Sequence, residues 1–342
     1  SRQRLLSSHS FPNQWDNEMN VVVTGTLGFD YIMNFSGRFA DRIMPEKIHK
    51  LSLSFLVDTL NKQFGGTAGN VAYSLKLLGV EPTIVAPVGN DFAPYKKFLQ
   101  SKKISTKRIA IHQDVATSAY FVMTDKEDNQ IGSFFMGATK YAKDLSIGSA
   151  LPYENFVVLG PTETQAMVLT VKECRLLSLP YLYDPAFQIA MFSSDELREG
   201  IGGAAILIGN DYEIALIEDR LDISHEELIL MVPVLVTTIG KKGSIIETRH
   251  DAIHVKPAKP KNEIDPTGAG DAYRAGFLAG YLRAVNSRSA LELTGDELLV
   301  CGQMGSVAAV YTVETYGTQT HTFTKKEFIN RYKANFGYTI TL

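Results

Sequence analysis

Short apolar runs alternate with helix-like segments along most of the chain. The β-branched run 21–26 predicts a buried strand, and residues 68–78, apolar at steps of three and four, predict a helix that ends at Gly79. Further strands are predicted at 83–88, 156–159, 181–183, 205–208 and 234–239, and further helices at 91–101 (capped by Asp91), 163–177, 194–199 and 212–218. Strands and helices that alternate at this spacing build a mainly parallel sheet through right-handed crossovers. The pattern therefore predicts a three-layer α/β/α sandwich.

Two regions interrupt this alternation. Residues 31–35 continue from the first strand, and the strand-like runs 118–123 and 130–136 flank a polar turn, a pattern typical of an antiparallel hairpin. These strands do not fit a parallel core. We therefore predict a small inserted β-sheet, formed by segments near 31–60 and 115–140, that projects from the body as a lid. Such a lid excludes water during transfer of a reactive group.

Residues 1–19 differ from the body that follows them. They are rich in Ser and Arg, contain the single Trp, and lack the long apolar core of a secretory signal. We interpret them as a disordered or artificially added extension, with a shortened organellar targeting segment as the alternative. Residues 20–342 are predicted to form one domain that carries the lid.

Composition and charge narrow the function classes. The chain has 34 Lys and Arg against 37 Asp and Glu, and its formal charge of −3 gives no basis for binding nucleic acid or an anionic membrane. No apolar run approaches the roughly 18–20 residues that span a bilayer. Cys174 and Cys301 stand alone in helix-like segments, which excludes a disulfide scaffold and a zinc cluster and fits a reducing cytoplasm.

The most informative stretch is Asp-Pro-Thr-Gly-Ala-Gly-Asp-Ala-Tyr at 265–273, directly before a helix rich in small residues. Gly268 and Gly270 remove side chains where the chain turns into that helix. The amides of Ala269, Gly270 and Asp271 would then converge at its positive end and bind an anion. The Asp271 carboxylate could accept a proton from an attacking hydroxyl while this anion hole holds a γ-phosphoryl group. Taken alone, the residues also allow a simple helix cap.

This stretch resembles the C-terminal signature of the PfkB/ribokinase family of sugar and nucleoside kinases, whose other motifs follow in order across almost the whole body. Gly65-Gly66-Thr67-Ala68-Gly69-Asn70 resembles the family's N-terminal signature, and Asp30 follows the first strand where the family places an acid. The resemblance implies a ribokinase-like fold. It also implies that Asp30 and Asn70, with the backbone of Gly65 and Gly66, bind the hydroxyls of the substrate.

A second group of motifs implies cofactor sites. Asn210-Asp211-Tyr212-Glu213 matches the family's Asn-x-x-Glu element, which implies that Asn210 contacts ATP and that Glu213 orders a hydrated Mg²⁺ rather than ligating it directly. In the family a monovalent cation such as K⁺ binds beside the anion hole. Asp265 and Thr267 match one side of that cation site.

The stretch 237–243 resembles the nucleotide loop of the same family. Thr238 would offer a hydroxyl to a phosphate of ATP, and Gly240 and Gly243 would allow the backbone to approach the nucleotide closely. Neither a P-loop nor the glycine fingerprint of a dinucleotide enzyme is present.

Residues 50–58 and 314–319 look like the corresponding stretches of bacterial-type adenosine kinases, as found in mycobacteria. The resemblance implies transfer of the ATP γ-phosphate to the 5′-hydroxyl of adenosine, giving AMP and ADP. One alternative is another kinase of the family, acting on ribose, fructose, inosine or guanosine. A second is a catalytically silent nucleoside-binding protein with this fold.

The aromatic residues of the predicted lid suit a nucleoside, because aromatic faces can stack on a purine. The resemblance implies that Phe121 and Phe134 would hold the base between them, and it allows one ring to come from a second subunit. Other implied contacts with ribose or base are Thr26, Ser54 and Gln188. Phe187 stands where close relatives often have a Gln, which leaves base recognition open. Since a projecting sheet has open edges that are usually covered, we predict a homodimer formed through the lids.

Overall fold

The apolar run that opens the body lies near the centre of a large sheet. The computed structural model describes residues 20–44, 50, 52–127, 129–148, 156–285 and 293–342; the extension predicted at 1–19 lies outside them. In spatial order the sheet contains β13 (Ala252–Val255), β12 (Ser244–Glu247), β11 (Val234–Thr238), β10 (Ile206–Asn210), β9 (Tyr181–Tyr183), β8 (Phe156–Leu159), β1 (Asn20–Thr24), β4 (Glu81–Val88) and β5 (Ile109–Ile111). Neighbours from β11 to β5 pair in parallel, and β12 and β13 are antiparallel. The mainly parallel sheet is confirmed.

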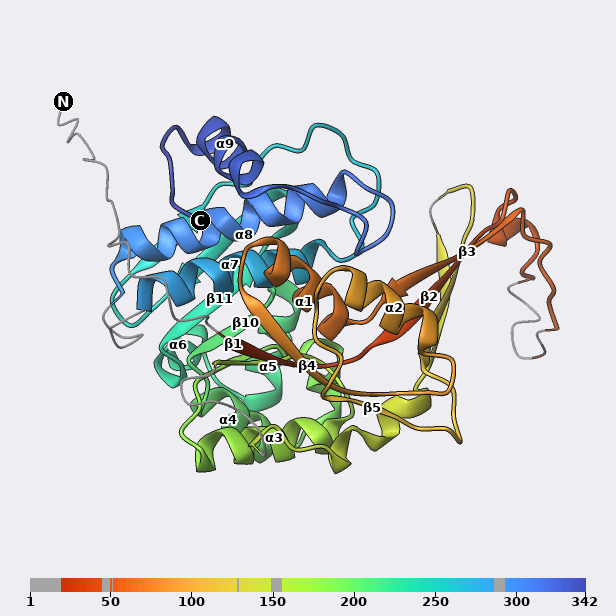
Figure 1. Ribbon diagram of the computed structural model, residues 1–342, viewed down its shortest axis with the longest axis horizontal. Coiled ribbons are helices and arrows are strands. Elements are labelled where there is room, and N and C mark those ends of the chain that lie inside the picture. Colours follow the sequence, from red (N-terminus) through yellow and green to blue (C-terminus); the bar gives the residue numbers. More distant parts are fainter. Residues whose placement is uncertain (1–19, 45–49, 51, 128, 149–155, 286–292) are drawn as a thin grey trace.

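Helices cover both faces of this sheet (Figure 1). One face packs against α1 (Thr67–Leu77), α2 (Ala93–Ser101), α7 (Ala269–Val285), α8 (Gly295–Val313) and α9 (Lys325–Phe336). The other packs against α3 (Thr164–Leu176), α4 (Ser194–Gly202), α5 (Asp211–Leu221) and α6 (His225–Met231). Val21 and Val23 belong to the first core and Val22 to the second. Because the sheet is buried on both faces, its central strands are apolar at successive positions.

Three details differ from the sequence-based expectation. Asp91 does not cap α2: the helix begins at Ala93, and the Asp91 carboxylate instead accepts a hydrogen bond of 2.8 Å from the amide of Thr117. Strands β12 and β13 were not predicted, because they follow β11 as antiparallel neighbours with no intervening α-helix and so lie outside the strand–helix alternation. Helix α6 was also missed, although Ser224 and Glu227 form the capping box that marks its start.

A second sheet projects from the body (Figure 1). It contains β3 (Thr59–Gly65), β2 (Gly28–Asn34), β6 (Ser118–Thr124) and β7 (Gln130–Phe135), in that order. The predicted hairpin is confirmed, since β6 and β7 pair in antiparallel fashion. Its turn is closed by Asp125, which accepts the amides of Glu127 and Asn129. The sheet extends to Gly65, further than the predicted boundary near 60, because β3 pairs with β2 along its whole length.

The described ranges contain no helix that combines the length and hydropathy required to cross a bilayer. Cys174 and Cys301 are both free thiols, and both are buried. Burial raises the pKa of the Cys174 thiol to about 12, so this group stays protonated at neutral pH.

Candidate active site

The loop before α7 turns sharply at Gly268. Its φ of +78° is a conformation that favours glycine, and a Cβ at this position would lie 2.8 Å from Cγ2 of Thr318. The Ala269 amide donates to the carbonyl of Pro266 at 3.1 Å, so it is not a free donor as predicted. The turn that positions the helix uses this amide, which leaves Gly270 and Asp271 as the first-turn donors of the anion hole.

The Asp271 carboxylate is held by a residue from the other end of the chain. Asn70 on α1 donates from Nδ2 to Asp271 Oδ2 at 2.8 Å. The Asn70 carbonyl oxygen accepts hydrogen bonds from Thr318 Oγ1 (2.7 Å) and Gln319 Nε2 (2.9 Å). Asn70 is therefore fixed on two sides and orients Asp271. The predicted contact of Asn70 with substrate would have to use its second amide hydrogen.

Burial raises the pKa of Asp271 above its ordinary value, and the nearby Glu213 carboxylate adds to this effect. The positive charge of Arg274 and the hydrogen bond from Asn70 act in the opposite direction. A carboxylate whose pKa lies closer to neutrality is a better general base at physiological pH. The environment of Asp271 thus suits proton abstraction.

Asp30 lies on β2, close to the same carboxylate. Burial, followed by the charges of Asp271 and Asp265, raises the pKa of Asp30 to about 6. A Cβ on Gly65 would lie 2.1 Å from Asp30 Oδ2, so glycine is required where the carboxylate packs against β3. Gly66 has a φ of +84°, and a Cβ there would lie 2.4 Å from the carbonyl oxygen of Thr26. The Gly pair therefore allows the backbone to pack closely against Asp30 and Thr26.

Sequence reasoning missed an ion pair beside Asp271. Arg274 Nη2 donates to Asp184 Oδ1 at 2.9 Å, and its Nε lies 2.5 Å from Asp184 Oδ2. Burial raises the pKa of Asp184 to about 6 even though Arg274 lowers it. Asp184 follows β9 at the carboxyl edge of the parallel sheet. An acidic residue directly after a predicted strand is the same pattern that identified Asp30 as a candidate, and it could have identified Asp184 as well.

Asn210 and Glu213 form a reciprocal cap at the start of α5. Glu213 Oε2 accepts the Asn210 amide, and Asn210 Oδ1 accepts the Glu213 amide, both at 2.8 Å. The cap uses Glu213 Oε2 and Asn210 Oδ1, and contacts of Glu213 Oε1 or Asn210 Nδ2 with a ligand stay a prediction. Asn210 pairs with Thr238 where β10 and β11 end, so the structure brings these two predicted nucleotide contacts together.

The two glycines of the predicted nucleotide loop have different surroundings. A Cβ on Gly243 would lie 2.0 Å from the carbonyl of Val255, so β13 explains this glycine without a nucleotide. Gly240 has a φ of +56° and open space around it. Only Gly240 therefore remains a candidate for close approach to a ligand.

Asp265 ties two loops together. Its Oδ1 accepts the amide of Thr267 at 2.9 Å, and its Oδ2 accepts the amide of Gly317 at 3.2 Å. Both carboxylate oxygens thus already have backbone partners. The K⁺ site at Asp265 and Thr267 stays a prediction.

Three predicted substrate contacts lie in other surroundings. The Thr26 hydroxyl lies 3.3 Å from that of Thr67 and closes the start of α1. Gln188 donates to the carbonyl of Thr162 at 2.5 Å and accepts from Thr164 at 3.3 Å, so each end of its amide has one partner inside the chain. Ser54 is exposed in the connection between β2 and β3, beyond the end of the lid sheet that carries Asp30. The roles of Thr26, Ser54 and Gln188 in binding substrate stay predictions.

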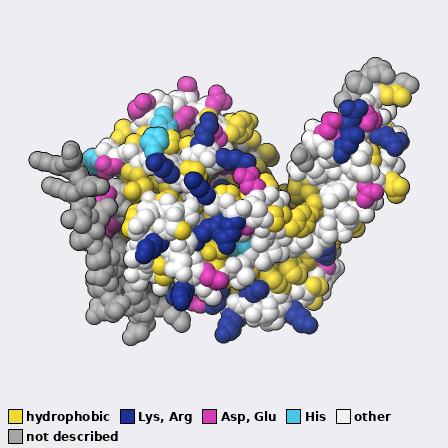
Figure 2. All heavy atoms as spheres, turned by 90° about the horizontal axis from the view of Figure 1, so that it is seen from above, with side chains coloured by type: hydrophobic (Ala, Val, Ile, Leu, Met, Phe, Trp, Pro, Cys, Tyr) yellow, Lys and Arg dark blue, Asp and Glu magenta, His cyan; other side chains and the backbone are white. Residues whose placement is uncertain are grey.

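The register of the lid separates the two predicted aromatic contacts. Asp30 pairs with Tyr120, which pairs with Phe134, so these three side chains share one face. Phe121 is on the opposite face, stacked on Tyr31 with ring centroids 4.7 Å apart. Hydrophobic side chains gather in the hollow between lid and body (Figure 2). Phe121 and Phe134 of one chain therefore cannot hold the same base between them.

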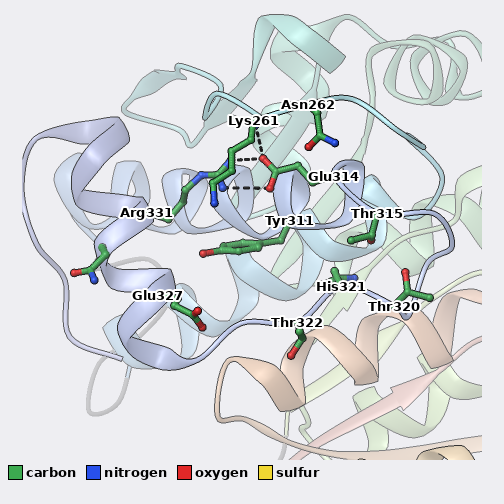
Figure 3. Close-up of a pocket in the computed structure, with 11 residues that line it drawn as sticks. Lys261, Asn262, Tyr311, Glu314, Thr315, Thr320, His321, Thr322, Glu327 and Arg331 are labelled. Carbon is green, nitrogen blue, oxygen red and sulfur yellow. Dashed lines mark hydrogen bonds and ion pairs between the residues drawn. The ribbon is translucent and has the colours of Figure 1, made fainter.

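A cavity of about 590 Å³ lies between α9, the end of α8 and residues 261–262 (Figure 3). Arg331 and the backbone of Lys261 both hydrogen-bond to Glu314 there. Thr320 and His321 form another wall, and they follow directly on the Thr318 and Gln319 pair that holds Asn70. The cavity thus borders the support of the site, and its cationic Arg331 is already paired.

The described residues contain no cluster of three or more His, Cys, Asp or Glu side chains with the geometry of a metal site. An Mg²⁺ that arrives with ATP needs no such cluster, since the ion keeps several waters and binds through one or two carboxylates and the substrate phosphates. Glu213 and Asp271 influence each other electrostatically. The ordering of a hydrated Mg²⁺ by Glu213 stays a prediction.

A parallel sheet with a projecting lid, and a carboxylate at a glycine-rich helix start, define a kinase of the ribokinase fold. Residues 30–325 match the family described as pfkB family carbohydrate kinase. The chain belongs to this family.

Similar proteins cover nearly the whole chain. It is 33% identical to a nucleoside kinase of Methanothermobacter thermautotrophicus over 94% of this chain and 98% of that protein. Its structure is similar to that of a Burkholderia thailandensis nucleoside kinase in complex with inosine, with a TM-score of 0.82, 30% identity, and 93% and 99% of the two chains covered. For a Methanocaldococcus jannaschii nucleoside kinase the TM-score is 0.78, at 27% identity, with 92% and 98% covered.

Proposed function

We propose that this protein is an ATP-dependent nucleoside kinase that phosphorylates the 5′-hydroxyl of its substrate. The observation that carries the proposal is the Asp271 carboxylate, fixed by Asn70 at the first turn of α7 beside the amides of the anion hole. Asp30 lies close enough to Asp271 for the charge of Asp271 to raise the pKa of Asp30. The names of the similar kinases, and the complexes of one of them with inosine and with ADP-inosine, support a nucleoside and ATP as the two substrates.

The reaction then follows from the positions of these groups. Asp30 accepts hydrogen bonds from the ribose hydroxyls and orients the 5′-oxygen. Asp271 takes the proton of the 5′-hydroxyl as that oxygen bonds to the γ-phosphorus, and the bond from the γ-phosphorus to the bridging oxygen of ADP breaks. The amides of Gly270 and Asp271 stabilise charge on the transferred group. Mg²⁺, held by water near Glu213, would neutralise charge on the phosphates of ATP.

The proposed substrate range is wider than adenosine. Each end of the Gln188 amide has one partner inside the chain, and Phe187 is 61% exposed. Recognition of the base by stacking alone tolerates different purines, since every base has a π-face. We therefore propose that adenosine and inosine are both substrates. Specificity for adenosine alone, which the sequence suggested, is the narrower alternative.

The test is ADP release from Mg²⁺-ATP with adenosine, inosine, guanosine, ribose or fructose as acceptor. We expect turnover with the purine nucleosides and none with the free sugars, which have no base to stack. Turnover with adenosine only would support the narrower alternative, an enzyme specific for adenosine. Better turnover on a free sugar would overturn the nucleoside assignment and leave the family unchanged.

The lid provides a second prediction, about the base. Phe134 shares a face with Asp30, and every residue of β7 is exposed. We propose that Phe134 stacks on the base bound by its own chain. We further propose that two lids pair in a homodimer, so that Phe121 of one copy meets the base bound by the other.

Phe134→Ala and Phe121→Ala should each raise KM for the nucleoside about tenfold, because stacking on a base contributes about 1–3 kcal/mol. KM for ATP should stay unchanged, since the predicted ATP contacts Asn210 and Thr238 lie on the main sheet rather than on the lid. If Phe121→Ala keeps a normal KM, or light scattering shows a monomer at micromolar concentration, the dimer is wrong and the role of Phe134 stands.

A further inference from the structure

Arg274 lies one turn after Asp271 on the same face of α7. Asp184 contacts one edge of its guanidinium: Nη2 donates a hydrogen bond to Oδ1 at 2.9 Å, and Nε forms an ion pair with Oδ2 at 2.5 Å. The Asp184 side chain is only 2% exposed and the Arg274 side chain 14%. A planar guanidinium held in such a two-point contact has a fixed orientation, which a lysine ammonium would not have.

The third nitrogen of this guanidinium, Nη1, lies beside Gly270 in the first turn of α7. A Cβ built on Gly270 would lie 2.7 Å from Arg274 Nη1. Gly270 therefore leaves space that the guanidinium occupies, in addition to offering its amide. Asp184 contacts Nε and Nη2, and Nη1 is the guanidinium nitrogen that lies beside Gly270, one of the residues predicted to bind the γ-phosphoryl group.

The charges around Arg274 support a role beyond a structural ion pair. Asp184, Asp271 and Glu213 all act on it electrostatically, and together they keep the guanidinium charged despite its burial. It is a cation beside the reacting groups that neither gains nor loses a proton during transfer. A fixed cation in a poorly solvated site stabilises charge on a transferred phosphoryl group, and arginines in this role contribute roughly 10³–10⁵-fold to kcat in other phosphotransferases.

We propose that Arg274 is a further catalytic residue, which donates from Nη1 to an oxygen of the γ-phosphoryl group, and that Asp184 is the positioning residue that aims it. The proposal rests on the function proposed above. Asp271 remains the proton acceptor, and Arg274 keeps all its protons while the new P–O bond forms and the bond to ADP breaks. Asp184 transfers no proton in the reaction and acts only by fixing the orientation of the Arg274 guanidinium.

The first test compares Arg274→Gln and Arg274→Lys with wild type in the ADP-release assay. We expect Arg274→Gln to lower kcat by about 10²–10³-fold, as for loss of one preorganised donor, with little change in KM for the nucleoside. Arg274→Lys should have a kcat between those of Arg274→Gln and wild type, because lysine keeps the positive charge but lacks the planar group with several fixed N–H donors. A kcat for Arg274→Gln within about threefold of wild type would overturn the proposal.

The matched control is Arg283→Gln. Arg283 is a partly buried arginine on the same helix that donates to the carbonyls of Ala279 and Leu78, far along α7 from the anion hole. Its loss should lower Tm without lowering kcat. If Arg283→Gln lowers kcat as much as Arg274→Gln, the effect belongs to helix stability, and the catalytic role is wrong.

Calorimetry separates this inference from the proposed function. Aluminium fluoride bound next to Mg²⁺-ADP imitates the transferred phosphoryl group. Wild type should therefore bind ADP more tightly when aluminium fluoride is added. Arg274→Gln should bind ADP alone as wild type does and lose the gain from fluoride. An equal gain in the variant, or no gain in wild type, overturns the role of Arg274. If wild type phosphorylates no nucleoside, the proposed function fails, and the calorimetric result still decides whether Arg274 acts on the phosphoryl group.

Discussion

Asp271→Asn is expected to lower kcat by about 10²–10⁴-fold while the protein folds normally and still binds its nucleoside. Asparagine has the shape of aspartate, and its carbonyl oxygen can still accept the Nδ2 hydrogen bond that Asn70 donates to Asp271 at 2.8 Å. The variant therefore keeps the local geometry. It loses only the group that takes the proton from the 5′-hydroxyl.

The pH dependence provides a second readout of the same variant. Asp271 must be ionised to act as a base, and burial raises its pKa above the ordinary value for Asp. Wild-type kcat should thus fall as the pH drops through this raised pKa. The residual activity of Asp271→Asn should lack this acidic decline. Near-normal turnover of the variant, or an unchanged pH profile, would exclude Asp271 as the base.

The alternation of strands and helices was predictable because a sheet buried on both faces needs apolar side chains at successive positions. Val21, Val22 and Val23 illustrate this, since they alternate between the two cores on either side of the sheet. The pairing of β2 with β6 was less accessible. Their parallel register joins residues 90 positions apart, such as Asp30 and Tyr120, and local patterning carries no information about such a pairing.

In the candidate site, too, local features were predictable from the sequence and contacts between distant residues were not. Motifs identified Asp30, Asp271 and the glycines around them, because backbone turns and buried acids leave a local signature. The contact between Asn70 and Asp271 joins residues 201 positions apart, and only the packing of α1 against α7 creates it. Prediction of Phe121 and Phe134 as one sandwich failed within a single chain for a simpler reason. The register of the hairpin decides which side chains share a face, and a motif does not specify it.

The second large effect is expected for Asn70→Ala. The substitution removes the donor that orients Asp271, and misplacement of a catalytic group by about 1 Å can lower the rate about 10²-fold. It also removes the acceptor of the hydrogen bonds from Thr318 and Gln319, both of which are buried. Thr318 and Gln319 keep second partners in the carbonyl of Phe64 and the hydroxyl of Tyr95, so Tm should fall by the loss of hydrogen bonds worth about 0.5–1.5 kcal/mol each.

Ser74→Ala is the matched control for this loss of stability. Ser74 is a buried polar residue one turn further along α1, and its hydroxyl contacts the ring of His321 at 3.4 Å rather than Asp271. The control should lower Tm and leave kcat close to wild type. A similar fall of kcat in both variants would mean that Asn70 acts only through the stability of α1.

The double variant Asn70→Ala/Asp271→Asn shows whether the two residues act as a unit. If Asn70 contributes to kcat by orienting the Asp271 carboxylate, its removal has little left to disturb once that carboxylate is an amide. The double variant should then turn over about as slowly as Asp271→Asn alone. Multiplicative losses would instead assign Asn70 a separate contact with the substrate, through its second amide hydrogen, as the family resemblance implies.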